Sequence, residues 1–192
     1  CEWESDEEKL AEADIYIISV SDRAVADVAR SLPFPEGAIV VHTAGSVPMS
    51  AIPERGGRRG ILYALQSFTK GRVIRLDKVP LFIEADSAET RDSLMAFARL
   101  ISSQVEYADS ARRKHIHLAG VFVNNFTNHM YHIGAEVVED EGLSFDVLKP
   151  LIEETASKAV ATNDPSMVQT GPAVRGDSGV TAEHIAMLKE DA

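Results

Sequence analysis

The chain has 192 residues, 45% of them hydrophobic, and its formal net charge is −11. This length and apolar content are sufficient for one substantial hydrophobic core or two small ones. The acidic balance argues against sequence-independent binding to nucleic acid and against an anionic membrane surface, because both require basic surfaces.

Cysteine usage and hydropathy indicate the compartment. Cys1 is the only cysteine, so no internal disulfide can form, and this favours a reducing compartment. No apolar run approaches the roughly 20 residues of a membrane span, and no charged-then-apolar leader opens the chain. We therefore expect a cytoplasmic protein. The chain begins with an acidic stretch and not with Met, so we also expect an N-terminal piece to precede it.

The first elements form a strand–helix–strand unit. Residues 14–20 and 38–41 are apolar runs without polar alternation, as in strands that are covered on both faces. A helical segment, 22–32, lies between them, and such a unit is right-handed and parallel almost without exception. Ligands of open α/β sheets bind beyond the carboxyl ends of parallel strands. The residues that follow the two strands should therefore line one crevice; they are Ser21, Asp22, His42, Thr43, Ala44 and Gly45.

The remainder of the first half continues this α/β pattern. The glycine-rich stretch 56–60 reads as a loop, and the next elements are an extended segment, a strand, a helix and a short strand, at 61–65, 79–85, 87–103 and 105–107. We place the boundary of this domain at residue 108. The fold class is thus an α/β domain over 1–108, followed by an all-α domain over 109–192.

The second half reads as helices. A long helix is expected over 109–140, a second over 145–161 with a kink at Pro150, and a short one over 181–189. Residues 163–179 between the last two read as a loop.

The long helix carries an unusual polar stripe. At about 100° per residue, four uncharged polar side chains share one narrow face; they are His117, Asn124, Asn128 and Tyr131. The apolar side of the helix is typical of a core or dimer face; it carries Leu118, Ala119, Phe122, Phe126, Met130 and Ile133. The stripe suits a ligand site in which each group bonds to something specific. The alternative is a buried amide network that joins helix to helix.

Two further groups of residues are candidate sites. The loop 169–177 combines two glycines and a proline with polar side chains, and Arg175 is able to hold a carboxylate or phosphate. A clasp between Arg175 and Asp177 that only shapes the loop is an equally good interpretation. His129 and His132 are three residues apart, but no third ligand is suitably placed, so we expect no metal site.

Several motifs together resemble one family. The segments are His42–Gly45, Leu65–Lys70, Val79–Glu84, His117–Ala119, Asn124–Phe126 and Gln169–Asp177, in this order. They resemble Rossmann-like proteins with a C-terminal domain of unknown function numbered 2520, often labelled NADP oxidoreductase, coenzyme F420-dependent. These are similar to pyrroline-5-carboxylate reductase and 6-phosphogluconate dehydrogenase. The resemblance implies a dinucleotide-binding domain, a helical dimerisation domain, and NADP or NAD as cofactor.

The sequence departs from this family pattern in two ways. It contains no Gly-rich turn of the G-x-G-x-x-G type, so the pyrophosphate cradle is not in this sequence. We expect either that a first β-α-β unit is missing or that the chain cannot bind a dinucleotide normally. The stripe also lacks the lysine that many relatives use as acid or base. His117 is therefore the stripe group that titrates near neutrality.

The resulting hypothesis is an NAD(P)-dependent oxidoreductase that transfers a hydride to or from a small carbonyl, imine or hydroxy acid. His117 would exchange the proton, and Asn124 and Asn128 would position the substrate. The resemblance places Ser19, Val20, Ser21 and His42–Gly45 near the cofactor. Substrate contacts are assigned to Gln66, Tyr131, Gln169, Thr170 and Arg175. The alternative is a non-catalytic dinucleotide- or metabolite-binding module, and in both cases we expect a homodimer through the C-terminal helices.

Overall fold

The computed structural model describes residues 10–54 and 57–190. It divides into two compact units, residues 1–128 and 129–192, and each is described by itself. Helix α3 belongs to the first unit because its Ile116 packs against the sheet. The predicted domain boundary at residue 108 stays a prediction, since compactness alone does not define a domain.

The first unit is built on a five-stranded sheet in the order β1-β2-β3-β4-β5. Strands β1 and β2 are parallel, with Ile15 opposite Ile39, which confirms the predicted strand–helix–strand unit around α1. Strand β3 is parallel to β2, β4 is antiparallel to β3, and β5 is parallel to β4. The bounds are β1 Ile15–Ile18, α1 Val25–Ser31, β2 Ile39–His42, β3 Arg58–Ala64, β4 Leu81–Ala85, α2 Ala88–Ile101 and β5 Val105–Tyr107.

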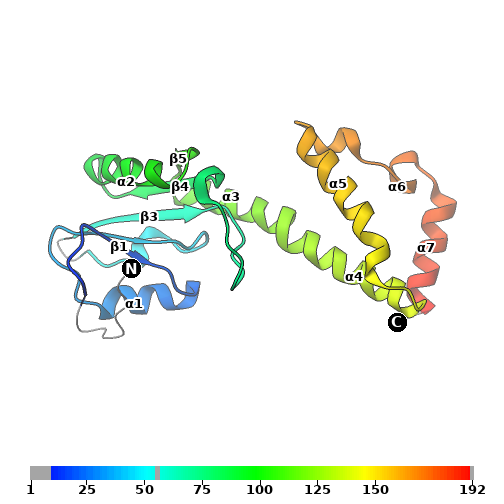
Figure 1. Cartoon of the computed structure of the whole chain (residues 1–192), viewed down its shortest axis with the longest axis horizontal. Coiled ribbons are helices and arrows are strands. Elements are labelled where there is room, and N and C mark those ends of the chain that lie inside the picture. The colour runs from blue at the N-terminus through cyan, green and yellow to red at the C-terminus, as the bar shows by residue number, and fades with distance from the viewer. Residues whose placement is uncertain (1–9, 55–56, 191–192) are drawn as a thin grey trace. The chain divides into compact units, whose positions relative to one another are not determined.

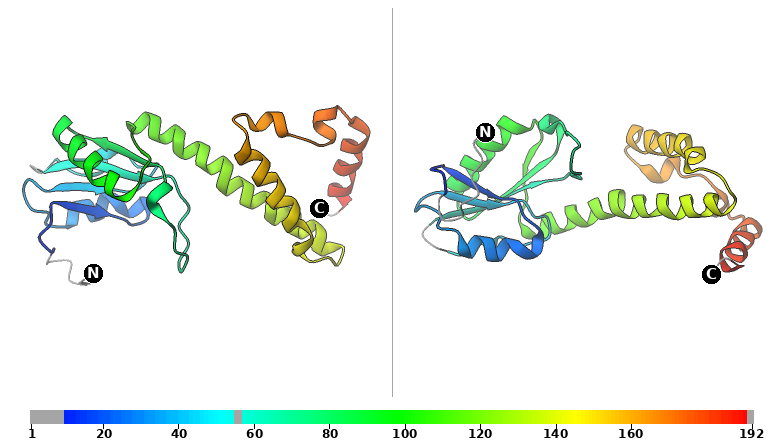
Figure 2. Two further views of the ribbon diagram at one scale, coloured as in Figure 1. Left: turned by 45° about the horizontal axis from the view of Figure 1, so that its top comes forward. Right: turned by 60° about the horizontal axis from the view of Figure 1, so that its bottom comes forward.

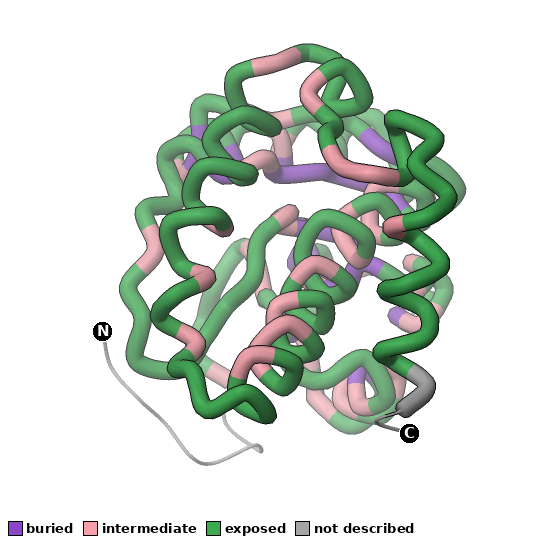
Figure 3. The backbone as a smooth tube through the Cα atoms, turned by 90° about the vertical axis from the view of Figure 1, so that its right-hand side faces the viewer, coloured by how far each residue is buried: buried purple, intermediate pink, exposed green. Residues whose placement is uncertain are grey.

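Helices cover both faces of this sheet, and Figures 1 and 2 show α1 and α2 on opposite sides of it. Because successive side chains of a strand point to opposite faces, Ile39 and Val41 of β2 pack in the core beneath α2, with Leu94 and Ala98. Val40, between them, packs on the other side with Ala29 of α1. The purple segments of Figure 3 mark these buried residues.

Strand β3 begins earlier than the sequence predicted. Arg58, Arg59 and Gly60 were expected in a loop, but they pair with β2 and open the strand. A Cβ atom at Gly60 would lie 2.4 Å from Leu94 Cδ1 and 2.7 Å from the Glu84 carbonyl oxygen. The glycine thus allows α2 to approach the sheet closely and does not mark a turn, which is why its sequence signal was misleading.

The predicted long helix is confirmed, with one irregularity. It consists of α3, Ser110–Gly120, a π-helical turn, Val121–Phe126, and α4, Thr127–Asp140. Asp109 caps its start by accepting a hydrogen bond from the Arg112 backbone N–H at 2.8 Å. Within the π-helical turn, the Thr127 hydroxyl donates to the Phe122 carbonyl oxygen at 3.2 Å. A single π turn inside an α-helix is rare and often lies at a functional site.

The second unit contains the greater part of α4 and three later helices, α5 Lys149–Ala161, α6 Pro172–Arg175 and α7 Ser178–Glu190. Pro150 lies in the first turn of α5, after a 3₁₀ turn, so the predicted kink is wrong. Proline is well tolerated there because the N–H that it lacks would have no intrahelical partner. The predicted loop 163–179 contains the 3₁₀ turn Pro165–Val168 as well as α6.

The second unit has no interior of its own. None of its described residues is buried, and many large apolar side chains are exposed, among them Met130, Leu151, Met167 and Ile185. The chain therefore joins an α/β Rossmann-like part with a buried core to an all-helical part without one. In the described part of the chain, no helix has the length and apolar character needed to cross a membrane.

Candidate functional site

The carboxyl ends of β1 and β2 border a crevice of about 310 Å³. Five residues predicted to contact a cofactor line it, namely Ser19, Val20, Thr43, Ala44 and Gly45, together with Asp22, Tyr63, Ala64, Gln66 and Phe68. The Asp22 carboxylate accepts a hydrogen bond from the Ser46 hydroxyl. Ser21 is exposed at the start of the turn Asp22–Ala24 and does not line the crevice.

His42 lies beneath this crevice and not in its wall. Its side chain is fully buried. The Ala44 backbone N–H donates to His42 Nδ1 at 3.2 Å, and His42 Nε2 lies 3.3 Å from the Pro48 carbonyl oxygen. Burial lowers the pKa of His42, and the charge of Arg113 lowers it further, so the ring is neutral at pH 7. Its side chain holds the turn that carries Thr43–Gly45.

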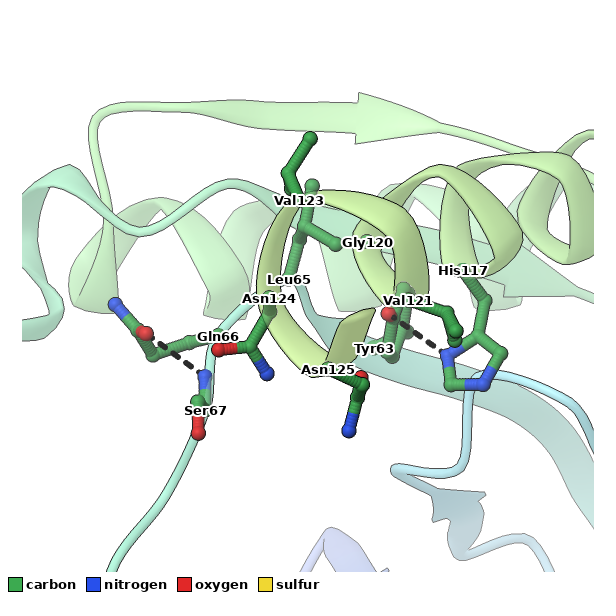
Figure 4. Close-up of a pocket in the computed structure, with 10 residues that line it drawn as sticks. All are labelled: Tyr63, Leu65, Gln66, Ser67, His117, Gly120, Val121, Val123, Asn124 and Asn125. Atoms are coloured by element: carbon green, nitrogen blue, oxygen red, sulfur yellow. Dashed lines mark hydrogen bonds between the residues drawn. The ribbon is translucent and has the colours of Figure 1, made fainter. Parts of the chain in front are cut away.

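A second cavity, of about 230 Å³, lies against the π-helical turn. Two predicted catalytic residues, His117 and Asn124, line it with the predicted substrate residue Gln66; the other lining residues are Tyr63, Leu65, Ser67, Gly120, Val121, Val123 and Asn125. Figure 4 shows the side chains of Asn124 and Asn125 on one side of the turn and that of Val123 on the other.

The π-helical turn changes which residues face the cavity. An α-helical period brings Asn124 and Asn128 onto the face of His117, whereas each residue of a π turn advances by a smaller angle around the axis. Asn125 therefore reaches the cavity beside Asn124, and the sequence analysis missed it for this reason. Asn128 is exposed and is not among the residues lining the cavity. Both Asn124 and Asn128 are exposed in the single chain, and the alternative of a buried amide network stays a prediction.

His117 forms a hydrogen-bonded pair with Tyr63. The Tyr63 hydroxyl lies 3.2 Å from His117 Nδ1, and the two rings meet edge to face with centroids 6.0 Å apart. Tyr63 also stacks on Phe82, and its residue is 8% exposed. The sequence analysis passed over Tyr63 as part of an apolar strand. Its position near the carboxyl end of that strand was the signal that could have identified it.

Gly45, in the turn after β2, lies close against the Tyr63–His117 pair because it has no side chain. A Cβ atom at Gly45 would lie 2.6 Å from His117 Nδ1 and 2.8 Å from Tyr63 Cε2, distances that real Cβ atoms do not adopt. Helix α3 therefore approaches the turn after β2 so closely that only glycine fits. The predicted meeting of the helix stripe with the strand ends is realised at His117.

The crevice and the cavity share two residues, Tyr63 and Gln66. A ligand in the crevice and a second ligand in the cavity would thus meet at the same two side chains. One hollow is bordered by strand ends and the other by the π-helical turn.

A buried ion pair fixes the start of α3. The Arg113 side chain is fully buried, and its Nη2 lies 3.3 Å from Glu84 Oε2 and donates to the Val47 carbonyl oxygen at 2.7 Å. The Ser110 hydroxyl donates to both oxygens of Glu84. Neither Nε nor Nη1 of Arg113 has a hydrogen-bond partner among the described residues. Arg113 is therefore part of the core at the first turn of α3 and does not belong to a solvated helix end.

The other predicted site residues belong to the second unit. The Arg175 side chain is exposed at the end of α6, and Gln169 Nε2 donates to the Thr170 carbonyl oxygen at 3.4 Å. Asp177 caps α7 by accepting from the Val180 backbone N–H at 3.2 Å, and no ion pair joins it to Arg175 within the described residues. The substrate roles of Tyr131, Gln169, Thr170 and Arg175 stay predictions.

Residues 79–192 match the family described as domain of unknown function 2520 (DUF2520). The chain belongs to the DUF2520 family. This DUF2520 protein is similar over 98% of its length to 73% of a Bacteroides fragilis protein named as an NADP oxidoreductase, with 40% identity and a TM-score of 0.84. No curated protein matches the sequence.

More distant structures share the fold of this DUF2520 protein. A Thermotoga maritima protein is 22% identical, with a TM-score of 0.78 over 94% of this chain and 72% of its own. A pyrroline-5-carboxylate reductase from Coxiella burnetii is 12% identical, with a TM-score of 0.50 over 92% of this chain and 70% of its own. Both likenesses confirm the Rossmann-like class.

Proposed function

We propose that this protein is an NAD(P)-dependent oxidoreductase that acts on a small carbonyl, imine or hydroxy compound. The observation that carries the proposal is the shared wall: Tyr63 and Gln66 border both the strand-end crevice and the cavity at the π-helical turn. The name of the Bacteroides fragilis relative, NADP oxidoreductase, supports the same class.

The crevice residues suit the nicotinamide–ribose end of a dinucleotide. Val20 and Phe68 offer apolar surface to a ring, while the Ser19 and Thr43 hydroxyls and the backbone of Ala44 and Gly45 offer hydrogen bonds. No Gly-rich turn is present in the sequence, so we assign no residue to the pyrophosphate. When bound, a nicotinamide cofactor supplies or accepts a hydride.

The residues of the cavity would handle the substrate. His117 is its titratable imidazole and supplies or accepts the proton that accompanies hydride transfer. The amides of Asn124 and Asn125, with that of Gln66, are able to bind a carbonyl or imine but cannot exchange a proton with it. We retain Asn128 and Arg175 as proposed substrate contacts from the sequence.

Calorimetry and a turnover screen test this proposal. The full-length protein should bind NADPH or NADH, and oxidation of the bound cofactor should be detected with at least one member of a panel of 2-oxo acids, ketones and cyclic imines. We expect His117→Ala to lower kcat/KM by about 10²-fold or more. His115→Ala is the matched control, because His115 is exposed on the same helix and its Nδ1 contacts the Ala111 carbonyl oxygen. Equal turnover in the His117→Ala and His115→Ala proteins would remove His117 from the mechanism.

A non-catalytic binding module is the second candidate. It is favoured by the cavity lining, in which no lysine occurs among the described residues. Cofactor binding without oxidation across the whole panel would support this module and contradict the oxidoreductase.

We also propose that the helical part forms a homodimer. The apolar face predicted on the long helix is exposed, with 59% of Phe122 and 56% of Met130 accessible, and the second unit lacks buried residues. A second copy of the chain would cover this apolar face, and each copy would cover the other equally, because symmetric dimers are the commonest oligomers.

A further inference from the structure

Among the described residues, Tyr63 lines both the strand-end crevice and the cavity at the π-helical turn, and its hydroxyl contacts His117. It projects from β3 between the strand-end crevice and the cavity at the π-helical turn, and it contributes to the lining of both. Its hydroxyl lies 3.2 Å from His117 Nδ1, as the dashed line in Figure 4 shows. A group placed in this way is able to pass a proton between His117 and a molecule in either hollow.

The position of the Tyr63–His117 pair is fixed by its surroundings. Phe82 stacks on the Tyr63 ring at a centroid distance of 6.3 Å, and the bare Cα of Gly45 lies against both members of the pair. Catalytic geometry requires such support, because small displacements of a proton donor are costly to the rate.

Arg113 supplies the charge that a tyrosine donor needs. A phenol that gives up its proton leaves a phenolate, and burial makes this anion unfavourable; burial accordingly raises the pKa of Tyr63. The positive charge of Arg113 opposes that rise, while the negative charge of Asp22 adds to it. The guanidinium of Arg113 is fully buried and forms an ion pair with Glu84, and its Nε and Nη1 have no hydrogen-bond partner among the described residues.

We propose that Tyr63 is a further catalytic residue: its hydroxyl gives the substrate the proton, and His117 returns a proton to it. This inference rests on the proposed function. During reduction, a bound reduced nicotinamide would supply a hydride to the substrate carbon, and the π electrons of the C=O or C=N bond would take the Tyr63 proton. The phenolate then takes the Nδ1 proton of the His117 imidazolium, and the neutral imidazole that remains is protonated again from solvent. In the oxidative direction, each transfer runs in reverse.

A purely structural Tyr63 would behave differently in a test. Tyr63→Phe keeps the ring and its stacking on Phe82 but removes the hydroxyl, so it separates packing from proton transfer. Tyr107→Phe is the matched control, because Tyr107 lies on β5 of the same sheet, is 45% exposed, and does not line either hollow.

The experiment combines three measurements on the full-length protein. Calorimetry measures the binding of NADPH and of NADH. Steady-state kinetics measure reduction of pyruvate, cyclohexanone and 1-pyrroline with each cofactor between pH 5 and 10, and ¹⁵N spectroscopy reports the imidazole nitrogens of His117. For Tyr63→Phe we expect a dissociation constant for NADPH within about twofold of wild type, about a 100-fold loss of kcat, and a changed ¹⁵N shift at His117 Nδ1. Tyr107→Phe should leave all three unchanged.

The possible failures are distinguishable. If wild type binds neither NADPH nor NADH, or binds one of them and reduces none of the three compounds, the proposed function fails and the role of Tyr63 fails with it. If wild type is active and Tyr63→Phe is equally active, only the role of Tyr63 is overturned. An unchanged ¹⁵N shift at His117 Nδ1 in Tyr63→Phe would show that the two groups are not bonded, and it would also overturn the inference.

Discussion

At the scale of single residues, His42 makes the stability of the fold depend on pH. Its ring is fully buried, with Nδ1 accepting from the Ala44 N–H and Nε2 close to the Pro48 carbonyl oxygen. Only the neutral form with its hydrogen on Nε2 satisfies both contacts. Burial lowers the pKa of His42 in the folded state, whereas the pKa of the same side chain in the unfolded chain is about 6.5. Below that pH the unfolded state binds a proton that the folded state does not, so acid favours unfolding.

We therefore expect the free energy of unfolding to fall as the pH drops below about 6.5, with a contribution from His42 of at most about 1.4 kcal/mol per pH unit. Urea denaturation at pH 7.5, 6.5 and 5.5 measures this dependence. His42→Asn should be less stable at pH 7.5 but should lose less stability on acidification. His115→Asn, on an exposed helical surface, should follow wild type. A pH dependence in His42→Asn as steep as that of wild type would contradict this account.

At the scale of elements, the closest approach is that of α3 to the turn after β2. Gly45→Ala would place a methyl group 2.6 Å from His117 Nδ1 and 2.8 Å from Tyr63 Cε2. Because both rings are held by the sheet and the helix, we expect the free energy of unfolding to fall by about 1–3 kcal/mol. Gly179→Ala is the control, since its methyl group would meet only Asp177 Oδ1, at an ordinary 3.7 Å. Urea denaturation compares the two; equal stability would show that α3 is free to move away from Gly45.

The sequence predicted those elements whose signal is local. The apolar runs of β1 and β2, the helix between them and the long helix that begins after Asp109 are confirmed. The errors at Gly60 and Asn125 have non-local causes: Gly60 lets α2 pack closely on the sheet, and the π-helical turn brings Asn125 to the cavity. His117 was identified by its helical spacing and Gln66 through the family resemblance, whereas the contact of Tyr63 with His117 is shown only by the structure. Periodicity therefore finds elements, while the site depends on close approach between them.

At the scale of the whole molecule, the contrast between the two units decides the expected assembly. The first unit buries three apolar clusters, whereas the described residues of the second include none that is buried. Helices without an interior gain little hydrophobic stabilisation by themselves, because that stabilisation scales with the apolar area removed from water. The exposed apolar face begins in the first unit with Leu118, Phe122 and Phe126, and α4 carries Met130 and Ile133. The same surface on a second chain is its natural complement.

We expect light scattering after size exclusion to give twice the 20.9 kDa mass of this chain at micromolar concentration. Met130 is 56% accessible on the exposed apolar face of α4, so Met130→Glu places a charge on that face. Burying an unpaired charge at an interface is costly. We therefore expect this variant to be monomeric and to have a lower thermal stability. Ser157→Glu, on the exposed surface of α5, adds the same charge and should leave the dimer intact. A wild-type protein that is monomeric in dilute neutral solution would exclude the dimer, and some other partner would then have to cover the helical unit.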